Sequence, residues 1–335
     1  MKKRICILTL GGTIAYAPRK SDDEEGSIVD LTPFIESLEE VKPIAAVDIK
    51  PVMRSSSSAL HVSDIIKVGN EIKTLIGQGY DGFIVIQGTD TIEETAFLLG
   101  LMLPVPQPVI VTGAMRNPDM RGADGPANVL ASIRVAASGK CRDIGSLVVF
   151  NDEIHSGLFV RKGHPQSTGA FVSESGPLGY LAEGTPSLRV VPVRRPIPWI
   201  DAERLAGKDV CHVPVYAVPL GDDGALLEKI EEMGYKGLVV AGLGGGHVPA
   251  EAVETLGRLA KKIPVILSSR IGCGDMLTST YSGYPGSETS LLGRGLISSG
   301  LLDPRKARIL LILLLMSGCS GEHIIESFRV FSKNF

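Results

Sequence analysis

The sequence predicts an α/β protein of two domains, in which a larger N-terminal domain contains a doubly wound, mainly parallel sheet and a smaller C-terminal α/β domain follows. Three observations predict this fold class. The chain has 335 residues, more than one ordinary domain requires. Short apolar runs alternate with amphipathic segments, which is the pattern of βαβ units with right-handed crossovers. A proline-rich stretch with little periodicity separates the two halves.

Six apolar runs have the length and composition of strands that are covered on both faces of a parallel sheet. They are residues 4–10, 83–86, 109–112, 146–150, 238–241 and 265–268. Between them, residues 63–76 and 225–233 show the spacing of amphipathic helices. The apolar run 309–316 follows Asp303 and Pro304, which is a helix-start signal. It is too short to cross a bilayer, which needs about 20 residues, and is therefore predicted to be a buried helix.

The boundary between the domains is predicted from composition. Residues 186–198 contain four prolines and a cluster of arginines, which is typical of a linker. We expect an N-terminal catalytic domain over residues 1–190, a linker over 191–208 and a C-terminal α/β domain over 209–335. Near the N-terminus, residues 16–27 form an acidic segment with few apolar side chains, which predicts a lid loop beside the first strand.

The composition argues against several classes of function. A net charge of −3 with both signs dispersed predicts no binding to nucleic acid or to a membrane. The five cysteines are scattered without paired metal spacing, which favours free thiols in a reducing compartment and no metal ion or other cofactor. The apolar run after the basic start ends at residue 10, too early for a secretory signal. We therefore expect a soluble, cytoplasmic protein.

Two predicted strands end in a glycine turn followed by threonine. Gly12 and Thr13 follow the first strand, and Gly88, Thr89 and Asp90 follow the second. Ligands of open α/β sheets bind beyond the carboxyl ends of the strands, so these side chains are candidates for a site. Glycine allows the backbone to approach a ligand closely, and the N–H groups after it can stabilise a developing oxyanion.

The same turns are also compatible with purely structural roles. Thr91 and Glu94 fit a capping box at the start of the next helix, so we expect them to be structural. A Thr-Asp pair before a helix is also common in turns. A threonine hydroxyl needs a base to become a nucleophile, and the six histidines show no triad spacing. A lysine whose pKa is lowered by burial is the alternative base, but the pattern does not identify which lysine.

Eight segments, in order along nearly the whole chain, resemble the bacterial-type L-asparaginases. They are TLGGTIA (9–15), QGTDTIEET (87–95), TGAMR with ADGPAN (112–128), FND (150–152), VRKG (160–163), SGPLGYL (175–181), LSSR (267–270) and LDPRKARILL (302–311). The resemblance implies a threonine amidohydrolase that converts L-asparagine to L-aspartate and ammonia. It also implies L-glutamine as a lesser substrate.

The resemblance implies roles for individual residues as well. Thr13 matches the primary nucleophile of the family, and Thr89, Asp90 and Lys162 match its second Thr-Asp-Lys cluster. In the family the lysine tunes the hydroxyl of the second threonine, and the aspartate accepts a hydrogen bond from the substrate ammonium. Whether Thr89 activates water or assists Thr13 stays open.

Further residues match the part of the family site that binds the substrate. Ser57 and the backbone of Gly88 match the groups that hold the substrate carboxylate, and a shift of one residue would place Ser58 there instead. Glu288 matches a glutamate that reaches into the site of the neighbouring subunit, which implies a homodimer or homotetramer. The alternative for Glu288 is a solvated loop carboxylate.

The sequence also departs from the family pattern. Residues 17–32 contain no tyrosine, although the family lid usually carries one. Ala59 and Gly245 stand where many relatives have polar side chains. Two alternatives therefore remain beside asparagine hydrolysis: a weakly active or non-catalytic amino-acid-binding relative, and the same hydrolysis of another small amide.

Overall fold

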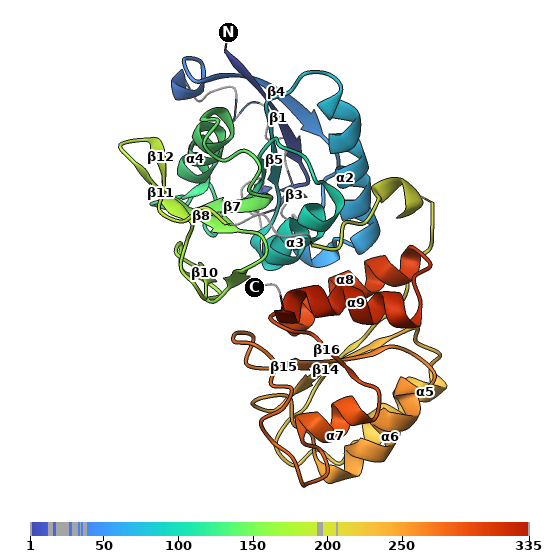
Figure 1. Cartoon of the computed structure of the whole chain (residues 1–335). Coiled ribbons are helices and arrows are strands. Elements are labelled where there is room, and N and C mark those ends of the chain that lie inside the picture. The colour runs from blue at the N-terminus through green and yellow to red at the C-terminus, as the bar shows by residue number, and fades with distance from the viewer. Residues whose placement is uncertain are drawn as a thin grey trace. The chain divides into compact units, whose positions relative to one another are not determined.

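The computed structural model divides into two compact units, residues 1–194 and residues 195–335 (Figure 1). The structure describes residues 2–12, 16–17, 27–28, 33, 35, 39–192, 197–205 and 207–333. Thr13 and most of the predicted lid loop 16–27 lie outside the described residues, and so does part of the predicted linker 191–208.

Within the described residues, the N-terminal unit has a large mixed sheet with the strand order β12-β11-β8-β7-β6-β5-β1-β4. One side of this sheet is parallel and comprises β4 (Ala45–Pro51), β1 (Lys3–Thr9), β5 (Gly82–Ile86), β6 (Val109–Thr112) and β7 (Ser146–Phe150). The other side is antiparallel and comprises β8 (Glu153–Ser156), β11 (Gly179–Ala182) and β12 (Thr185–Leu188). The predicted fold class, α/β with a mainly parallel sheet, is confirmed.

Helices cover both faces of this sheet. The side chains of alternate residues on the central strands, such as Ile5, Ile84 and Ile110, form one core with α4 (Gly125–Ala137). Helix α3 (Ile92–Met102) packs on β6 and β7, and α2 (Val62–Ile76) packs on α3 (Figure 1). Central strands that are covered on both sides need continuous apolar runs, which is the pattern that predicted them.

After β7 the chain forms two hairpins. Asn151 and Asp152 form the loop between β7 and β8, with φ of 51° and 59°. Two consecutive residues with positive φ are typical of a two-residue hairpin turn, and asparagine and aspartate tolerate that conformation. After β8 the chain forms a second hairpin of β9 (Val160–Lys162) and β10 (Phe171–Ser173). Two further short strands, β2 (Tyr16–Ala17) and β3 (Ser27–Ile28), pair with each other.

The C-terminal unit, as far as it is described, contains a parallel sheet in the order β13-β14-β15-β16. The strands are β13 (Val215–Ala217), β14 (Leu238–Gly242), β15 (Val265–Ser269) and β16 (Ile297–Ser298). Figure 1 shows α5 (Ala225–Glu232), α6 (Ala250–Ala260) and α7 (Glu288–Gly293) on one face, and α8 (Pro304–Met316) and α9 (Gly321–Lys333) on the other.

The apolar segment near the C-terminus is a buried helix, as predicted. Asp303 caps α8 by accepting hydrogen bonds from the backbone N–H groups of Arg305 (2.9 Å) and Lys306 (3.4 Å). Proline at the first helical position removes one N–H that would otherwise need a partner. Within the described ranges, every helix falls short of the length and apolarity that a membrane crossing requires.

Candidate active site

The glycine turns after β1 and β5 are in direct contact. A Cβ atom added to Gly12 would lie 2.1 Å from the backbone N of Gly88, and Gly12 has a φ of 94°. A Cβ atom added to Gly88 would lie 2.5 Å from Ser57 Oγ. Because no side chain fits at either glycine, the two turns and the serine segment can meet only with these residues.

Thr89, Asp90 and Lys162 form one hydrogen-bonded cluster beside this contact. Lys162 Nζ donates to Thr89 Oγ1 and to Asp90 Oδ1, with both distances 2.9 Å. Thr89 is buried and begins the 3₁₀ helix η4 (Thr89–Thr91), whereas Lys162 comes from the distant strand β9. The fold therefore brings an amine, a hydroxyl and a carboxylate together from two parts of the sequence.

Asp90 is held as an accessible, ionised carboxylate. The hydrogen bond from Lys162 lowers the pKa of Asp90 below its usual value, burial acts in the opposite direction, and the hydrogen bond from Ser57 lowers it further. The Asp90 side chain is 61% exposed, so a cationic group from solution can reach it. These properties suit a carboxylate that binds an ammonium group.

The structure separates the two serines between which the sequence did not decide. Ser57 is buried, and its hydroxyl donates to Asp90 Oδ2 (2.9 Å) and accepts from the backbone N of Asp90 (3.3 Å). Ser58 is exposed, and its hydroxyl lies 3.0 Å from that of Ser56. Ser57 therefore belongs to the cluster with Asp90.

The capping-box prediction for Thr91 is wrong. Thr91 stands at the N-cap position of α3, but its side chain makes no hydrogen bond to the first turn of the helix. Its hydroxyl instead accepts from Gln87 Nε2 (3.1 Å) and donates to the carbonyl O of Ser57 (3.4 Å). The carbonyl O of Ser57 is thus the partner of the Thr91 hydroxyl in place of the first turn of α3, and this hydrogen bond holds the segment with Ser57 against the turn after β5. Nothing local in the sequence could have indicated it.

The segment with TGAMR and ADGPAN is explained by hydrogen bonds within the loop before α4. The Asp124 carboxylate accepts from the backbone N–H groups of residues 115–116, at 3.0 and 2.9 Å. Asn128 Nδ2 donates to the carbonyl O of Gly113 (3.0 Å), and Asn128 Oδ1 accepts from the backbone N of Asn151 (2.9 Å). These side chains connect the loops that follow β6 and β7, at the same edge of the sheet as the cluster.

Comparison with known families places nearly the whole chain. The chain matches the family model described as "Asparaginase, N-terminal" over residues 4–194, and the model described as "Glutaminase/Asparaginase C-terminal domain" over residues 212–328. The chain belongs to the asparaginase family. The resemblance seen in the sequence motifs is thereby confirmed.

Individual relatives of this asparaginase-family chain match it along almost its full length. A probable L-asparaginase of Deinococcus radiodurans is 33% identical over 97% of both chains. A glutaminase-asparaginase of Pseudomonas fluorescens is 31% identical over 97% of this chain and 89% of its own. The crystal structure of a probable cytoplasmic L-asparaginase from Campylobacter jejuni superimposes with a TM-score of 0.87 at 30% identity. It covers 98% of this chain and 99% of its own.

Glu288, the remaining residue of the predicted asparaginase site, lies in the C-terminal unit. Its carboxylate is fully buried and accepts hydrogen bonds from the backbone N of Tyr281 (2.5 Å) and from His247 Nε2 (3.2 Å). Burial by itself raises the pKa of Glu288, but the hydrogen bonds from these groups and from its own N–H leave it below the usual value. Glu288 is therefore not a solvated loop carboxylate.

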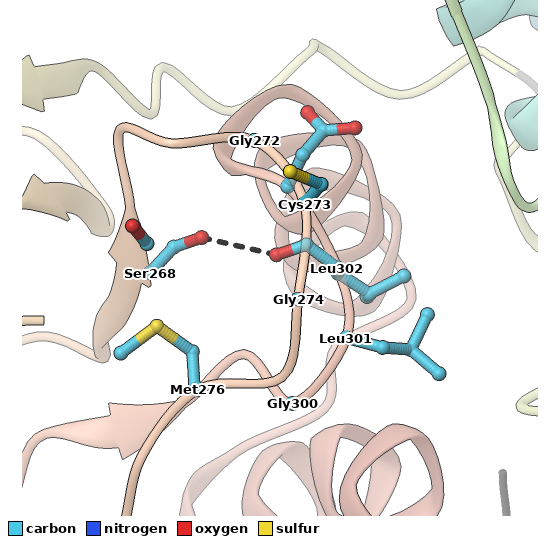
Figure 2. Close-up of a pocket in the computed structure, with 10 residues that line it drawn as sticks. Ser268, Gly272, Cys273, Gly274, Met276, Gly300, Leu301 and Leu302 are labelled. Carbon is cyan, nitrogen blue, oxygen red and sulfur yellow. Dashed lines mark hydrogen bonds between the residues drawn. The ribbon is translucent and has the colours of Figure 1, made fainter. Parts of the chain in front are cut away.

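The C-terminal unit also has a hollow at the carboxyl end of β15, shown in Figure 2. Ser268 Oγ donates to the carbonyl O of Leu302 (3.0 Å) across it, and Cys273 and Met276 line it. Its volume of about 10 Å³ has room for about one water molecule. A substrate the size of asparagine does not fit there. In the described parts of the chain, no three His, Cys, Asp or Glu side chains are grouped to hold a metal ion.

Proposed function

We propose that this chain is an amidohydrolase that converts L-asparagine to L-aspartate and ammonia by means of threonine hydroxyls. The observation that carries the proposal is the pair of 2.9 Å contacts from Lys162 Nζ to Thr89 and Asp90, beside the two touching glycine turns. Family membership supports the same reaction, because relatives of nearly equal length are named L-asparaginase.

The cluster suits the binding of a small zwitterion. Asp90 is ionised and accessible, and it accepts a hydrogen bond from the α-ammonium of the substrate. Ser57 and the backbone of Gly88 lie against Asp90 and Thr89, where a hydroxyl and a peptide group can hold the α-carboxylate. Fixing both charged ends of the substrate places its side-chain amide at a defined position, which lowers the entropic part of the barrier.

The reaction proceeds by addition of an oxygen to the amide carbon and expulsion of ammonia. In this proposal the Thr13 hydroxyl adds to the carbonyl, its proton passes to a basic group and from there to the amide nitrogen, and the C–N bond breaks to leave ammonia and an ester. Water then hydrolyses that ester to L-aspartate and restores the hydroxyl. Lys162 and Thr89 exchange the proton either with Thr13 or with the attacking water. A hydroxyl held by an amine is arranged for such a transfer.

The proposal includes an assembly and a cellular location. The chain forms a homodimer or homotetramer in the cytoplasm, in which Glu288 contacts the substrate ammonium in the site of a neighbouring subunit. A carboxylate has about four acceptor positions. The N–H groups of Tyr281 and of Glu288 itself and the Nε2 of His247 use three of them, which leaves one for the ammonium. The similar protein of known structure from Campylobacter jejuni is described as cytoplasmic, which supports the location.

Ammonia release from L-asparagine by the purified protein tests this function. We expect Thr13→Ala and Thr89→Val each to lower kcat by about 10³-fold or more, because the residues of such a unit act together. If wild-type protein releases no more ammonia than Thr13→Ala while it still binds L-asparagine, the chain is an amino-acid-binding relative. A panel that includes L-glutamine decides the substrate, and a higher kcat/KM on another amide would replace asparagine in the proposal.

A further inference from the structure

The strand that carries Lys162 is attached to helix α3 by a buried carboxylate. Glu93 is the second residue of α3 and is only 2% exposed. Its Oε2 accepts a hydrogen bond from the backbone N of Lys162. The sequence patterns assign no role to Glu93, and the reaction proposed above does not use it.

The geometry of the hairpin explains why this N–H needs a partner outside its own sheet. Lys162 pairs with Phe171, and the next residue, Gly163, donates its N–H to the carbonyl O of Ala170 (2.7 Å). Hydrogen-bonded and non-hydrogen-bonded pairs alternate in an antiparallel ladder, so the N–H of Lys162 points away from β10. Glu93 supplies an acceptor at the open edge of β9, in place of a neighbouring strand.

Glu93 is also rigidly connected to the hydroxyl that Lys162 contacts. The 3₁₀ helix that starts at Thr89 is followed directly by α3, so only three residues, 90–92, separate Thr89 from Glu93. The contacts therefore form a closed ring. It runs along the helix from Thr89 to Glu93, across to the backbone of Lys162, and back through Lys162 Nζ to Thr89 Oγ1.

We propose that Glu93 is a positioning residue, which holds the backbone of Lys162 where its amine reaches both Thr89 and Asp90. This inference rests on the proposed function, because it assigns to Lys162 a part in the reaction. The amine lies at the end of a four-carbon stem, so its two contacts require the backbone of Lys162 to stay within the reach of that stem. A misplacement of about 1 Å at a reacting group costs about 10²-fold in rate.

The chemistry of Glu93 favours this role over simple filling of the core. Burial of a carboxylate is unfavourable unless it is hydrogen-bonded, whereas an apolar side chain would fill the same space without that cost. A hydrogen bond from an N–H group to a carboxylate is shorter and stronger than one to a neutral acceptor. The other strand of the hairpin, β10, is held by separate contacts. The ring centroids of Phe150 and Phe171 lie 4.9 Å apart, and His155 Nδ1 lies 3.0 Å from Ser173 Oγ.

Two substitutions of Glu93 separate positioning from bulk stability. Glu93→Gln keeps a carbonyl oxygen that can accept the hydrogen bond, and we expect its kcat to stay within about threefold of wild type. Glu93→Ala removes the acceptor, and we expect kcat to fall by about 100-fold with KM changed less than about threefold. Thr95→Ala, at another buried position on α3, is the matched control and should keep its kcat.

A double-mutant cycle with Lys162→Met tests whether Glu93 acts through the lysine. If it does, Glu93→Ala lowers kcat about 100-fold in wild type but less than about threefold in the Lys162→Met background. If the two losses multiply, or if kcat per folded molecule is unchanged in Glu93→Ala, the positioning role is wrong.

A crystal structure of Glu93→Ala gives a measurement that does not depend on activity. We expect Lys162 Nζ to lie beyond hydrogen-bond distance of Thr89 Oγ1, and an unchanged contact would contradict the proposal. If wild-type protein fails to hydrolyse asparagine, the proposed function is wrong. The position of Lys162 in this variant still tests the role of Glu93.

Discussion

Asp90 in the N-terminal unit and Glu288 in the C-terminal unit are both expected to meet the ammonium group of the substrate, yet their surroundings differ. Asp90 is 61% exposed, and its partners include a lysine amine from a distant strand. Glu288 is fully buried, and its partners lie within the C-terminal unit, on the loop before α7 and after β14. Both have a pKa below the usual value. For Asp90 the largest cause is the hydrogen bond from the lysine, whereas for Glu288 the largest single cause is burial, which raises the pKa, and the hydrogen bonds together outweigh it.

Two carboxylates of the same charge can thus differ in role, because an exposed one is available to a ligand and a buried one is occupied by the donors around it. An exposed carboxylate can be replaced by the amide of the same shape with little effect on stability, because the amide keeps an oxygen that accepts a hydrogen bond. A buried carboxylate with several donors leaves those donors unpaired when it is removed, which costs about 1–3 kcal/mol. We therefore expect substitutions at Asp90 to change activity alone, and substitutions at Glu288 to change activity and stability together.

The largest effect is expected from removal of the amine beside Asp90. Lys162→Met should lower kcat by about 10³-fold across the neutral pH range with the fold unchanged. The pKa of Asp90 should rise toward its ordinary value, because the hydrogen bond from Lys162 is the main cause of its depression. Kinetics and an NMR titration of the Asp90 carboxyl measure the two effects. A pH–rate profile identical to wild type would remove Lys162 from the reaction.

The second prediction compares the two serines of the binding segment. Ser57→Ala should lower kcat/KM by about 100-fold, since the site loses a hydroxyl that contacts Asp90 and is proposed to bind the substrate carboxylate. Ser58→Ala is the matched control and should change kcat/KM by less than about twofold, because its hydroxyl is exposed and lies beside that of Ser56, away from Asp90. The opposite order of effects would place Ser58 in the site.

The third prediction tests the comparison of the two carboxylates directly. Glu288→Gln should lower the free energy of unfolding by about 2 kcal/mol, because an amide cannot accept every hydrogen bond that the carboxylate accepts. Asp90→Asn should change it by less than about 0.5 kcal/mol while it abolishes most activity. Denaturant unfolding of both variants measures these values. Equal losses of stability would show that the difference in burial has no energetic consequence.

The smallest effect is expected in the pH dependence of stability. The pKa of Glu288 is lowered by folding, so its contribution is complete above the ordinary value of 4.5 and is lost as the pH falls through the lower, folded value. The difference in unfolding free energy between wild type and Glu288→Gln should therefore shrink below about pH 4.5. A difference that stays constant from neutral to acidic pH would contradict the lowered pKa.

His155 provides a contrasting pH response in the N-terminal unit. Burial lowers its pKa, and the neighbouring Glu153 carboxylate opposes that shift in part. The folded protein thus binds this proton less readily than the unfolded chain does. The contribution of His155 to the free energy of unfolding is therefore complete above its ordinary pKa of 6.5 and declines as the pH falls below that value.

The sequence by itself determined the elements whose signals are local. The apolar runs 109–112 and 146–150 coincide with β6 and β7, because a strand covered on both faces must be apolar throughout. The antiparallel strands after Asn151 were missed because they are short and contain no continuous apolar run. β8 is mostly buried but includes Glu153, His155 and Ser156, and β12 (Thr185–Leu188) is partly exposed and occupies the start of the proline-rich stretch. The glycine turns after β1 and β5 were also readable, because glycine has few other reasons to follow a strand.

Only the tertiary structure decided which of these side chains lie together. Lys162 could be chosen by family resemblance but not by pattern, because its distance from Thr89 depends on how a separate hairpin packs beside α3. Tertiary packing also decides three further contacts. Ser57 rather than Ser58 lies against Asp90, the hydroxyl of Thr91 turns toward the serine segment, and the Glu93 carboxylate turns toward β9. Periodicity and turn composition report on neighbours along the chain, whereas these contacts join segments that only the packed core brings together.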